Sequence, residues 1–163
     1  MGLGSNVGEA EENLNEALAR LANYGVDIQL KKQSAIYRTE PQGLKDQPWF
    51  ANQVVELGVD PEIWAPEGLL STFLAIEAQM GRDRTTETPQ GPRVIDLDLL
   101  LFGDLVTDNG FLTVPHPRLR ERAFMLVPLQ EIAPGLILPG GGTPADALKS
   151  LKYRVDGNRI WQD

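Results

Sequence analysis

Two helical segments, each flanked by extended segments, place the strongest limit on how this chain can fold. Residues 9–23 carry Leu14, Ala17 and Leu21 on one side of a helix, and residues 66–80 repeat apolar residues at helical spacing. Apolar patterns that alternate or run continuously predict strands around these helices, over residues 1–3, 26–39, 51–59 and 94–102. The predicted order is therefore β-α-β-β-α-β.

That order is typical of split βαβ folds, so we expect an α+β domain with the ferredoxin-like βαββαβ sandwich arrangement. The chain beyond residue 102 is expected to add C-terminal helices and a small hairpin. These are predicted over residues 120–132, near Asp146 and over residues 153–161. A length of 163 residues is that of one ordinary domain, so we expect residues 1–163 to form a single domain.

Charge and cysteine content argue against several classes of protein. A net charge of −8 argues against a general nucleic-acid-binding protein. The sequence contains no apolar run of the roughly 18 residues that a membrane span needs, and no signal peptide is expected at its start. The absence of cysteine excludes disulfides and thiolate metal sites and fits a reducing compartment. We expect a cytoplasmic protein without nucleic-acid or membrane partners.

The strongest chemical signal is a pair of acidic residues inside the apolar strand predicted over residues 94–102. Asp96 and Asp98 share one face of that strand because side chains alternate along it. Two ionised carboxylates in an apolar strand repel each other and need a compensating cation. Mg²⁺ is the natural partner, since it accepts one or two carboxylates together with phosphate oxygens and water. The alternative is a strand whose acidic pair faces solvent.

Arginines gather in the same part of the chain. Six of the ten arginines lie between residues 82 and 122, which indicates a small anionic ligand or, alternatively, a solvated surface. Arg82 and Arg93 bracket a polar loop, which suggests a lid that carries positive charge onto a triphosphate. No Walker A motif is present, so a phosphate site has to come from these arginines and the acidic pair.

Residues suited to a flat ring occur elsewhere in the chain. Phe50 and Asn52 open a predicted strand and share one side of it, where they suit stacking and hydrogen bonding to a heterocycle. Core packing is the alternative for both Phe50 and Phe124. His116 is the only histidine and lies between two prolines. A lone histidine is more often structural than functional, but three arginines follow it closely, at positions 118, 120 and 122.

Together these motifs resemble those of the 6-hydroxymethyl-7,8-dihydropterin pyrophosphokinase family. The likeness is carried by the run from Gly91-Pro92-Arg93 to Asp98 and by Val114-Pro115-His116-Pro117. Shorter matches are Gly2-Leu3-Gly4-Ser5-Asn6, Tyr37-Arg38-Thr39, Pro48 to Asn52, Gly81 to Arg84, Phe102-Gly103 and Arg122 to Pro128. The resemblance implies diphosphate transfer from ATP to the hydroxymethyl group of the reduced pterin, with release of AMP, in folate biosynthesis. It also implies small-molecule substrates, and we expect a monomer.

The resemblance implies a role for each matching residue. Asp96 and Asp98 would hold two Mg²⁺ ions, and Arg82 and Arg93 would contact the transferring phosphoryl groups. The ATP-binding positions would be Glu77, Arg84, Leu99, Thr113, His116 and Arg122. Phe50 and Phe124 would sandwich the pterin, and the remaining substrate-binding positions would be Thr39, Glu40, Gln42 and Asn52.

This sequence departs from the family pattern in the predicted lid, where Thr88-Pro89-Gln90 replaces an arginine and an aromatic residue of many relatives. Phe111 replaces a basic residue that some relatives have near the position that contacts adenine. Three alternatives remain open at this point. They are another metal-dependent nucleotidyl or glycosyl transferase, a catalytically silent pterin- or nucleotide-binding protein, and one domain of a folate-pathway fusion.

Overall fold

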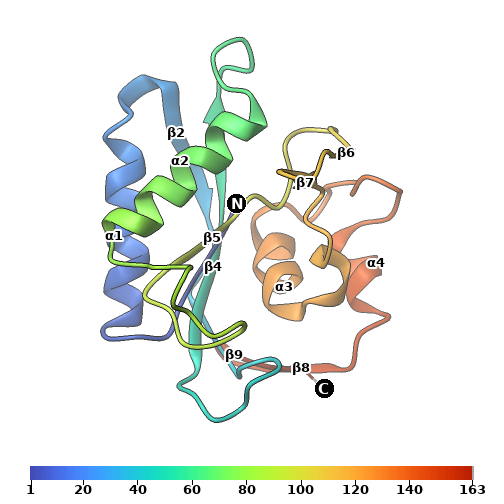
Figure 1. Ribbon diagram of the computed structural model, residues 1–163. Helices are drawn as coiled ribbons and strands as arrows, with labels where there is room; N and C mark the ends of the chain where they lie inside the picture. The colour runs from blue at the N-terminus through green and yellow to red at the C-terminus, as the bar shows by residue number, and fades with distance from the viewer. Residues whose placement is uncertain (163) are drawn as a thin grey trace.

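The computed structural model describes residues 1–162, and it consists of a central sheet with helices on both faces (Figure 1). The sheet has seven strands in the order β5-β1-β4-β3-β9-β8, and β2 also pairs with β4. Among the described strands, only β3 and β9 pair in parallel. The strands are β1 Gly2–Ser5, β2 Ile28–Gln33, β3 Tyr37–Thr39, β4 Phe50–Val59, β5 Asp96–Asp98, β8 Tyr153–Asp156 and β9 Arg159–Gln162. Strands β6 Thr107–Asp108 and β7 Thr113–Val114 form a separate small sheet.

The helices divide between the two faces of the large sheet. Helices α1 (Ala10–Ala22) and α2 (Pro66–Gln79) cover one face, and α3 (Ala123–Ile132) and α4 (Pro144–Leu148) cover the other (Figure 1). Short 3₁₀ helices, η1 and η2, span Gly25–Asp27 and Leu119–Glu121. Each helix pair covers its own hydrophobic cluster, and alternation along the central strands supplies both. The predicted α+β class, the helix near Asp146 and the C-terminal hairpin are confirmed.

The predicted strand over residues 26–39 is wrong as a continuous element. It divides into η1, β2 and β3, with a break at Ser34. The Ser34 hydroxyl accepts the Val54 amide hydrogen at 3.1 Å, and the Gln53 side-chain amide donates to the Ser34 carbonyl at 2.7 Å. Side chains thus replace part of the backbone ladder at this point. A register shift between Leu30 and Lys32 bends β2 further.

The strand predicted over residues 94–102 is also shorter than expected. Regular pairing covers only Asp96–Asp98, because the partner strand β1 pairs with β5 only from Gly2 to Gly4. The predicted third helix begins at Ala123, and a 3₁₀ turn occupies the residues before it. The small β6–β7 sheet was not predicted.

Strand register places the acidic pair on β5, the edge strand of the large sheet, beside β1. Gly4 lies between Asp96 on one neighbouring strand and Asn52 on the other, while Gly2 is opposite Asp98. A Cβ atom at Gly4 would lie 2.8 Å from the Asn52 side-chain oxygen, so a larger residue here would displace the Asn52 side chain. The two carboxylates and Asn52 therefore point to the α3 side of the sheet. Within residues 1–162, no helix is long and apolar enough to cross a membrane.

Candidate active site

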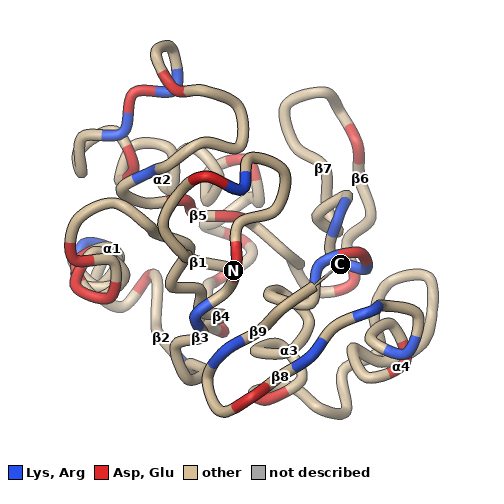
Figure 2. The backbone as a smooth tube through the Cα atoms, turned by 90° about the horizontal axis from the view of Figure 1, so that it is seen from below, with Lys and Arg blue, Asp and Glu red and all other residues tan. Residues whose placement is uncertain are grey.

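A cleft lies between the β5-β1-β4 part of the sheet and the segment that leads into α3. Its floor comes from β1, β4 and β5, and it includes Asn52, Asp96 and Asp98. Its walls combine two phenylalanines with arginines, namely Phe50, Arg93, Arg118, Arg122 and Phe124. Thr39, Glu40 and Gln42 complete it on the β3 side. Figure 2 shows that positions of lysine and arginine are spread along the backbone among those of aspartate and glutamate.

The two carboxylates on the floor have different partners. Asp96 receives hydrogen bonds from Arg82 and from Arg93, the latter at 2.9 Å, and its oxygen lies 3.6 Å from the Arg84 guanidinium. Asp98 lies 3.9 Å from His116 Nε2 and makes no ion pair with lysine or arginine in the described part of the chain. The acidic pair is therefore compensated on one side only.

This asymmetry shifts the pKa values of the two carboxyl groups in opposite directions. Burial would raise the pKa of Asp96, but the charges of Arg93 and Arg82 hold it below its ordinary value. Burial and the neighbouring Asp96 charge raise the pKa of Asp98 to about 7. An additional cation at Asp98 would remove this penalty, so the pair fits a metal ion. No group of three or more His, Cys, Asp or Glu metal ligands occurs within residues 1–162, so other ligands would have to come from phosphate and water, as Mg²⁺ accepts.

A buried network of ion pairs packs against β5 on the α2 side of the sheet. The Glu77 carboxylate accepts the Leu97 amide hydrogen at 2.7 Å, and it pairs with Arg82 at 2.9 Å and with Arg84 at 2.7 Å. Arg82 also donates to the Ile95 carbonyl and to Glu87. Burial raises the pKa of Glu77, whereas the Leu97 amide and Arg82 oppose that shift. In this structure Arg82 is thus held in the network and does not line the cleft.

The arginines in the wall of the cleft give it positive charge. Burial and the neighbouring Arg118 lower the pKa of Arg122. Within residues 1–162, the buried Nε atoms of Arg93 and Arg122 have no hydrogen-bond acceptor. Buried donors without acceptors are costly, so these two atoms indicate that the cleft takes an anionic ligand.

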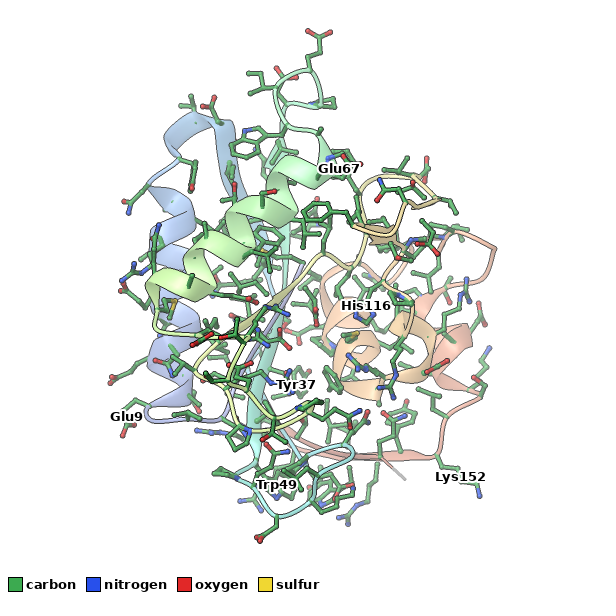
Figure 3. The ribbon with its side chains drawn as sticks, in the orientation of Figure 1. Glu9, Tyr37, Trp49, Glu67, His116 and Lys152 are labelled. Atoms are coloured by element: carbon green, nitrogen blue, oxygen red, sulfur yellow. The ribbon has the colours of Figure 1, made fainter. Side chains whose placement is uncertain are left out.

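His116 lies beside α3 (Figure 3) and has a defined protonation state. Burial and the Arg122 charge lower its pKa to about 4, so the imidazole is neutral at pH 7. Its Nδ1 accepts the Arg118 amide hydrogen at 3.1 Å, which assigns the ring proton to Nε2. The Nε2–H group can therefore serve as a donor near Asp98.

The candidates for binding a flat ring, Phe50, Asn52 and Phe124, all line the cleft. Alternation along β4 places Phe50 and Asn52 on the same side of that strand. The Arg93 guanidinium lies 5.1 Å from the Phe50 ring centroid, and that of Arg122 lies 5.4 Å from the Phe124 ring. Asn52 is buried and donates its side-chain amide to the Thr39 hydroxyl at 2.6 Å. The cleft thus offers two aromatic faces and a fixed amide, which suit a flat polar heterocycle.

Some predicted residues lie outside the cleft. Leu99 is buried in the core beside another groove, and the Thr113 hydroxyl donates to Asp108 in the β6–β7 sheet. Glu77 and Arg84 belong to the network behind Asp96. Glu40 and Gln42 contact Gln162, so the end of β9 borders the substrate side.

Three residues near the site were missed as candidates. Arg118 and Gln90 line the cleft, and Gln90 has the left-handed backbone conformation with φ of 61°. Asn6 accepts the Arg93 amide hydrogen at 2.8 Å and donates to the Pro48 carbonyl at 3.0 Å, so it ties together two loops at the site. The cluster of arginines was a signal for Arg118, and the matching segment Gly2-Leu3-Gly4-Ser5-Asn6 was the signal for Asn6.

Comparison with known proteins agrees with the chemistry of the cleft. Residues 1–134 match the family described as 7,8-dihydro-6-hydroxymethylpterin-pyrophosphokinase (HPPK). The chain belongs to the HPPK family. The resemblance drawn from the sequence motifs is thereby confirmed.

Individual relatives cover most of the chain. The 2-amino-4-hydroxy-6-hydroxymethyldihydropteridine pyrophosphokinase of Methylorubrum extorquens is 46% identical over 93% of this chain and 91% of its own length. The Bacillus subtilis enzyme of the same name is 42% identical over 80% of this chain and 74% of its own. A protein of Pisum sativum named folate synthesis bifunctional protein, mitochondrial, is 39% identical over 80% of this chain and 24% of its own length. The HPPK unit thus occurs both in short proteins and within longer ones.

Proposed function

We propose that this HPPK-family protein transfers a diphosphate from ATP to the hydroxymethyl group of 6-hydroxymethyl-7,8-dihydropterin, releasing AMP, in folate biosynthesis. The observation that carries the proposal is that one cleft contains the acidic pair Asp96 and Asp98, two phenylalanines, and arginine Nε donors without an acceptor among residues 1–162. Phosphate and a flat heterocycle are the two chemical parts that such a cleft recognises.

The reaction is a displacement at the β-phosphorus of ATP. The pterin hydroxymethyl oxygen forms a bond to that phosphorus, the bond from the α,β-bridging oxygen to it breaks, and AMP leaves with that oxygen. The hydroxyl proton passes to water. No general base is assigned, because positioning and charge neutralisation supply most of the rate in phosphoryl transfer.

Asp96 and Asp98 would hold two Mg²⁺ ions, which when bound neutralise phosphate charge and lower the pKa of the attacking hydroxyl. Support comes from the raised pKa of Asp98, which marks carboxylate charge without a partner. Arg93 would donate to the transferring phosphoryl groups, because its guanidinium lies at the cleft beside Asp96. Arg82 would join it after release from its carboxylate partners.

The remaining contacts follow from the family roles. Arg122 and His116 would bind ATP from the α3 side, where a free guanidinium donor and a neutral Nε2–H group lie near the acidic pair. Glu77, Arg84, Leu99 and Thr113 would bind ATP from positions outside the cleft. Phe50 and Phe124 would sandwich the pterin. Its polar edge would bond Asn52 and the segment that contains Thr39, Glu40 and Gln42.

The architecture supports further parts of the proposal. The strand order β5-β1-β4, followed by β2 and β3 on the other edge of β4, supports a ferredoxin-like core within a single domain. The cleft already contains the acidic pair, arginines and both phenylalanines, so the proposed monomer needs no residue from a second copy. The absence of cysteine fits the proposed cytoplasmic location, where thiols are kept reduced.

Replacement of Arg93 should separate transition-state stabilisation from binding. We expect Arg93→Ala to lower turnover by about a hundredfold, as for loss of one charge-stabilising donor. Steady-state kinetics at saturating ATP and pterin measure the effect. Arg20→Ala is the control, because Arg20 pairs with Glu16 on the surface of α1. An effect on the ATP KM alone would assign Arg93 to binding only.

The decisive test measures AMP release from ATP and Mg²⁺ with and without 6-hydroxymethyl-7,8-dihydropterin. Pterin-dependent AMP, with diphosphorylated pterin in equal amount, is the expected result. ADP as the product would mean transfer of a single phosphoryl group. Absence of turnover together with measurable pterin binding would favour a catalytically silent binding protein.

A further inference from the structure

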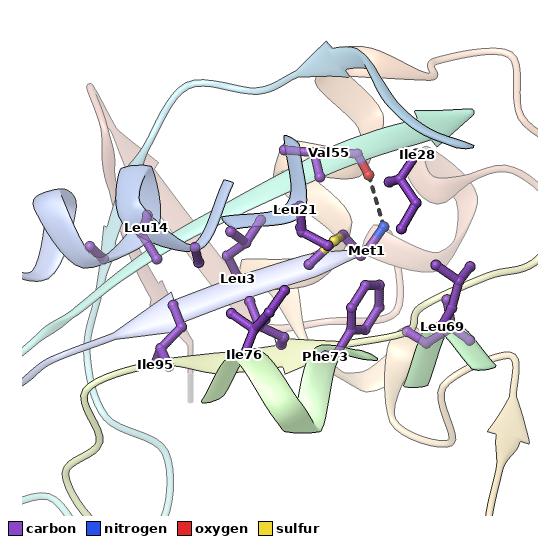
Figure 4. Close-up of a cluster of buried hydrophobic side chains, with 14 of the residues drawn as sticks. Met1, Leu3, Leu14, Leu21, Ile28, Val55, Leu69, Phe73, Ile76 and Ile95 are labelled. Atoms are coloured by element: carbon purple, nitrogen blue, oxygen red, sulfur yellow. Dashed lines mark hydrogen bonds between the residues drawn. The ribbon is translucent and has the colours of Figure 1, made fainter. Parts of the chain in front are cut away.

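The two sides of the large sheet are held by different kinds of contact. On the α1–α2 side, apolar side chains such as Leu14, Leu21 and Phe73 form one cluster (Figure 4). On the other side, polar contacts from β9 also hold the segments that border the cleft. Gln162 of β9 takes part in four hydrogen bonds to these segments. Gln162 was not among the predicted site residues.

Two of these hydrogen bonds fix the start of α3. The Gln162 side chain accepts the Ala123 amide hydrogen at 2.7 Å and donates to the Glu121 carbonyl at 2.6 Å. Glu121 and Ala123 lie on either side of Arg122, whose backbone is extended between η2 and α3, with φ of −118° and ψ of 108°. The two bonds therefore hold the bend at Arg122 from both sides.

This contact supplies an acceptor that the segment before α3 lacks. The first amide hydrogens of a helix have no acceptor within the helix, and Ser, Thr, Asp or Asn at the N-cap position usually provides one. Arg122 occupies the N-cap position of α3, and a guanidinium group can only donate. Gln162 provides the acceptor instead, from a strand 39 residues further along the chain than Ala123.

The residues held in this way form one wall of the cleft. Arg122 and Phe124 both line it, and the Arg122 guanidinium lies 5.4 Å from the Phe124 ring centroid. Phe124 belongs to the first turn of α3, so its ring moves with the start of that helix. The hydrogen bonds of Gln162 thus help to set the position of one aromatic face of the cleft.

The same residue also reaches the β3 side of the cleft. The Gln42 side-chain amide donates to Gln162 Oε1 at 2.8 Å, and the Gln162 backbone amide donates to the Glu40 carboxylate at 3.2 Å. Glu40 and Gln42 both line the cleft. Gln162 Oε1 therefore accepts hydrogens from two segments that border the cleft at different places.

Strand pairing explains how β9 reaches both segments. β9 runs parallel to β3, with Ile160 opposite Thr39, so the following residues of β9 lie alongside the segment after β3. Alternation directs Ile160 and Gln162 to the same face, and Ile160 is buried in the cluster that α3 covers. Trp161 contacts Trp49, with ring centroids 5.5 Å apart. β9 thus contacts both ends of the loop between β3 and β4.

We propose that Gln162 is a positioning residue for the flat heterocycle, because it holds Phe124 and the segment from Glu40 to Gln42 in fixed relative positions. This inference rests on the proposed function. Gln162 acts through the two segments that it joins, and these segments carry the groups that contact the ring. Loss of its side chain would release both segments at once, so the free protein would no longer be preorganised for the ring.

The test replaces Gln162 by methionine, which keeps the length of the side chain and removes its three hydrogen bonds. Calorimetry measures binding of 6-hydroxymethyl-7,8-dihydropterin in the presence of Mg²⁺ and α,β-methylene-ATP, an analogue that cannot release AMP. We expect Gln162→Met to raise the pterin Kd by about tenfold, because preorganisation is lost. The pterin KM should rise by a similar factor while kcat changes less than about threefold, since ring contacts act equally on ground and transition states.

Gln162→Glu and Arg159→Ala are the matched controls. The glutamate keeps an acceptor for the Ala123 and Gln42 donors, so its pterin Kd should lie closer to that of the parent than to that of Gln162→Met. Arg159 is an exposed residue of the same strand, and its replacement should leave the pterin Kd unchanged within about twofold. Thermal unfolding establishes a temperature at which every variant is folded, and binding is measured there.

Equal pterin Kd values for the parent and Gln162→Met would overturn the inference. That result would hold even if the Tm of the variant fell, because the hydrogen bonds would then serve stability alone. Absence of pterin binding by the parent would instead refute the proposed function, and the role of Gln162 would fail with it.

Discussion

Asp98→Asn is expected to lower turnover by at least about a thousandfold while the protein remains folded. The substitution keeps the shape of the side chain and removes the carboxylate that lacks a lysine or arginine partner within residues 1–162. A neutral amide is a poor ligand for Mg²⁺ in a site with so few protein ligands. The measurement is pterin-dependent AMP release over a range of Mg²⁺ concentrations.

The same variant should be at least as stable as the parent at pH 8. The folded-state pKa of Asp98 is raised from 3.8 to about 7, so its contribution to stability is lost as pH rises from about 4 to 7. The substituted amide would carry no charge to repel Asp96. Thermal unfolding at pH 8 tests this, and Asp104→Asn is the control because Asp104 is exposed in the same part of the chain. For the turnover prediction, activity of Asp98→Asn within tenfold of the parent would refute the assignment of Asp98 as a metal ligand.

Glu77→Ala is expected to reduce the free energy of unfolding by roughly 3–5 kcal/mol, the usual cost of breaking a buried ion pair from one side. The change leaves the Leu97 amide without its acceptor and removes a carboxylate from the buried Arg82. For a chain of this size, Tm should fall by roughly 10 °C. Urea unfolding of the purified variant gives the free energy directly.

Glu87→Ala provides the matched control for this network. Glu87 also pairs with Arg82, but its side chain is more exposed than that of Glu77 and accepts no backbone hydrogen. We expect a loss below about 1 kcal/mol from this variant. If Glu77→Ala cost no more than Glu87→Ala, the buried network would contribute little to the fold.

Local periodicity accounts for much of what could be predicted about the cleft. The two-residue repeat of a strand placed Asp96 with Asp98, and Phe50 with Asn52, and all four line the cleft. The cluster of arginines drew attention to Arg118 but did not predict that Arg118 lines the cleft. Its position at the cleft depends on how the segment before α3 packs against the sheet, which involves residues remote in the sequence.

Strand lengths show where prediction from the sequence fails. The apolar run over residues 94–102 has the composition of one long strand, yet its regular pairing ends at Asp98 because β1 extends no further. Ser34 interrupts the strand predicted over residues 26–39 by bonding to Gln53 and Val54 of another strand. Both outcomes depend on the partner strand, which no local window contains.

The α+β class, the main helices, the acidic pair and the family could all be predicted from the amino-acid sequence alone, because periodicity and motifs are properties of neighbouring residues. Folding was needed to establish which carboxylate is compensated, which arginines keep free donors and which predicted residues lie outside the cleft. These features arise from burial and from pairing between distant segments, and both exist only after the chain has folded.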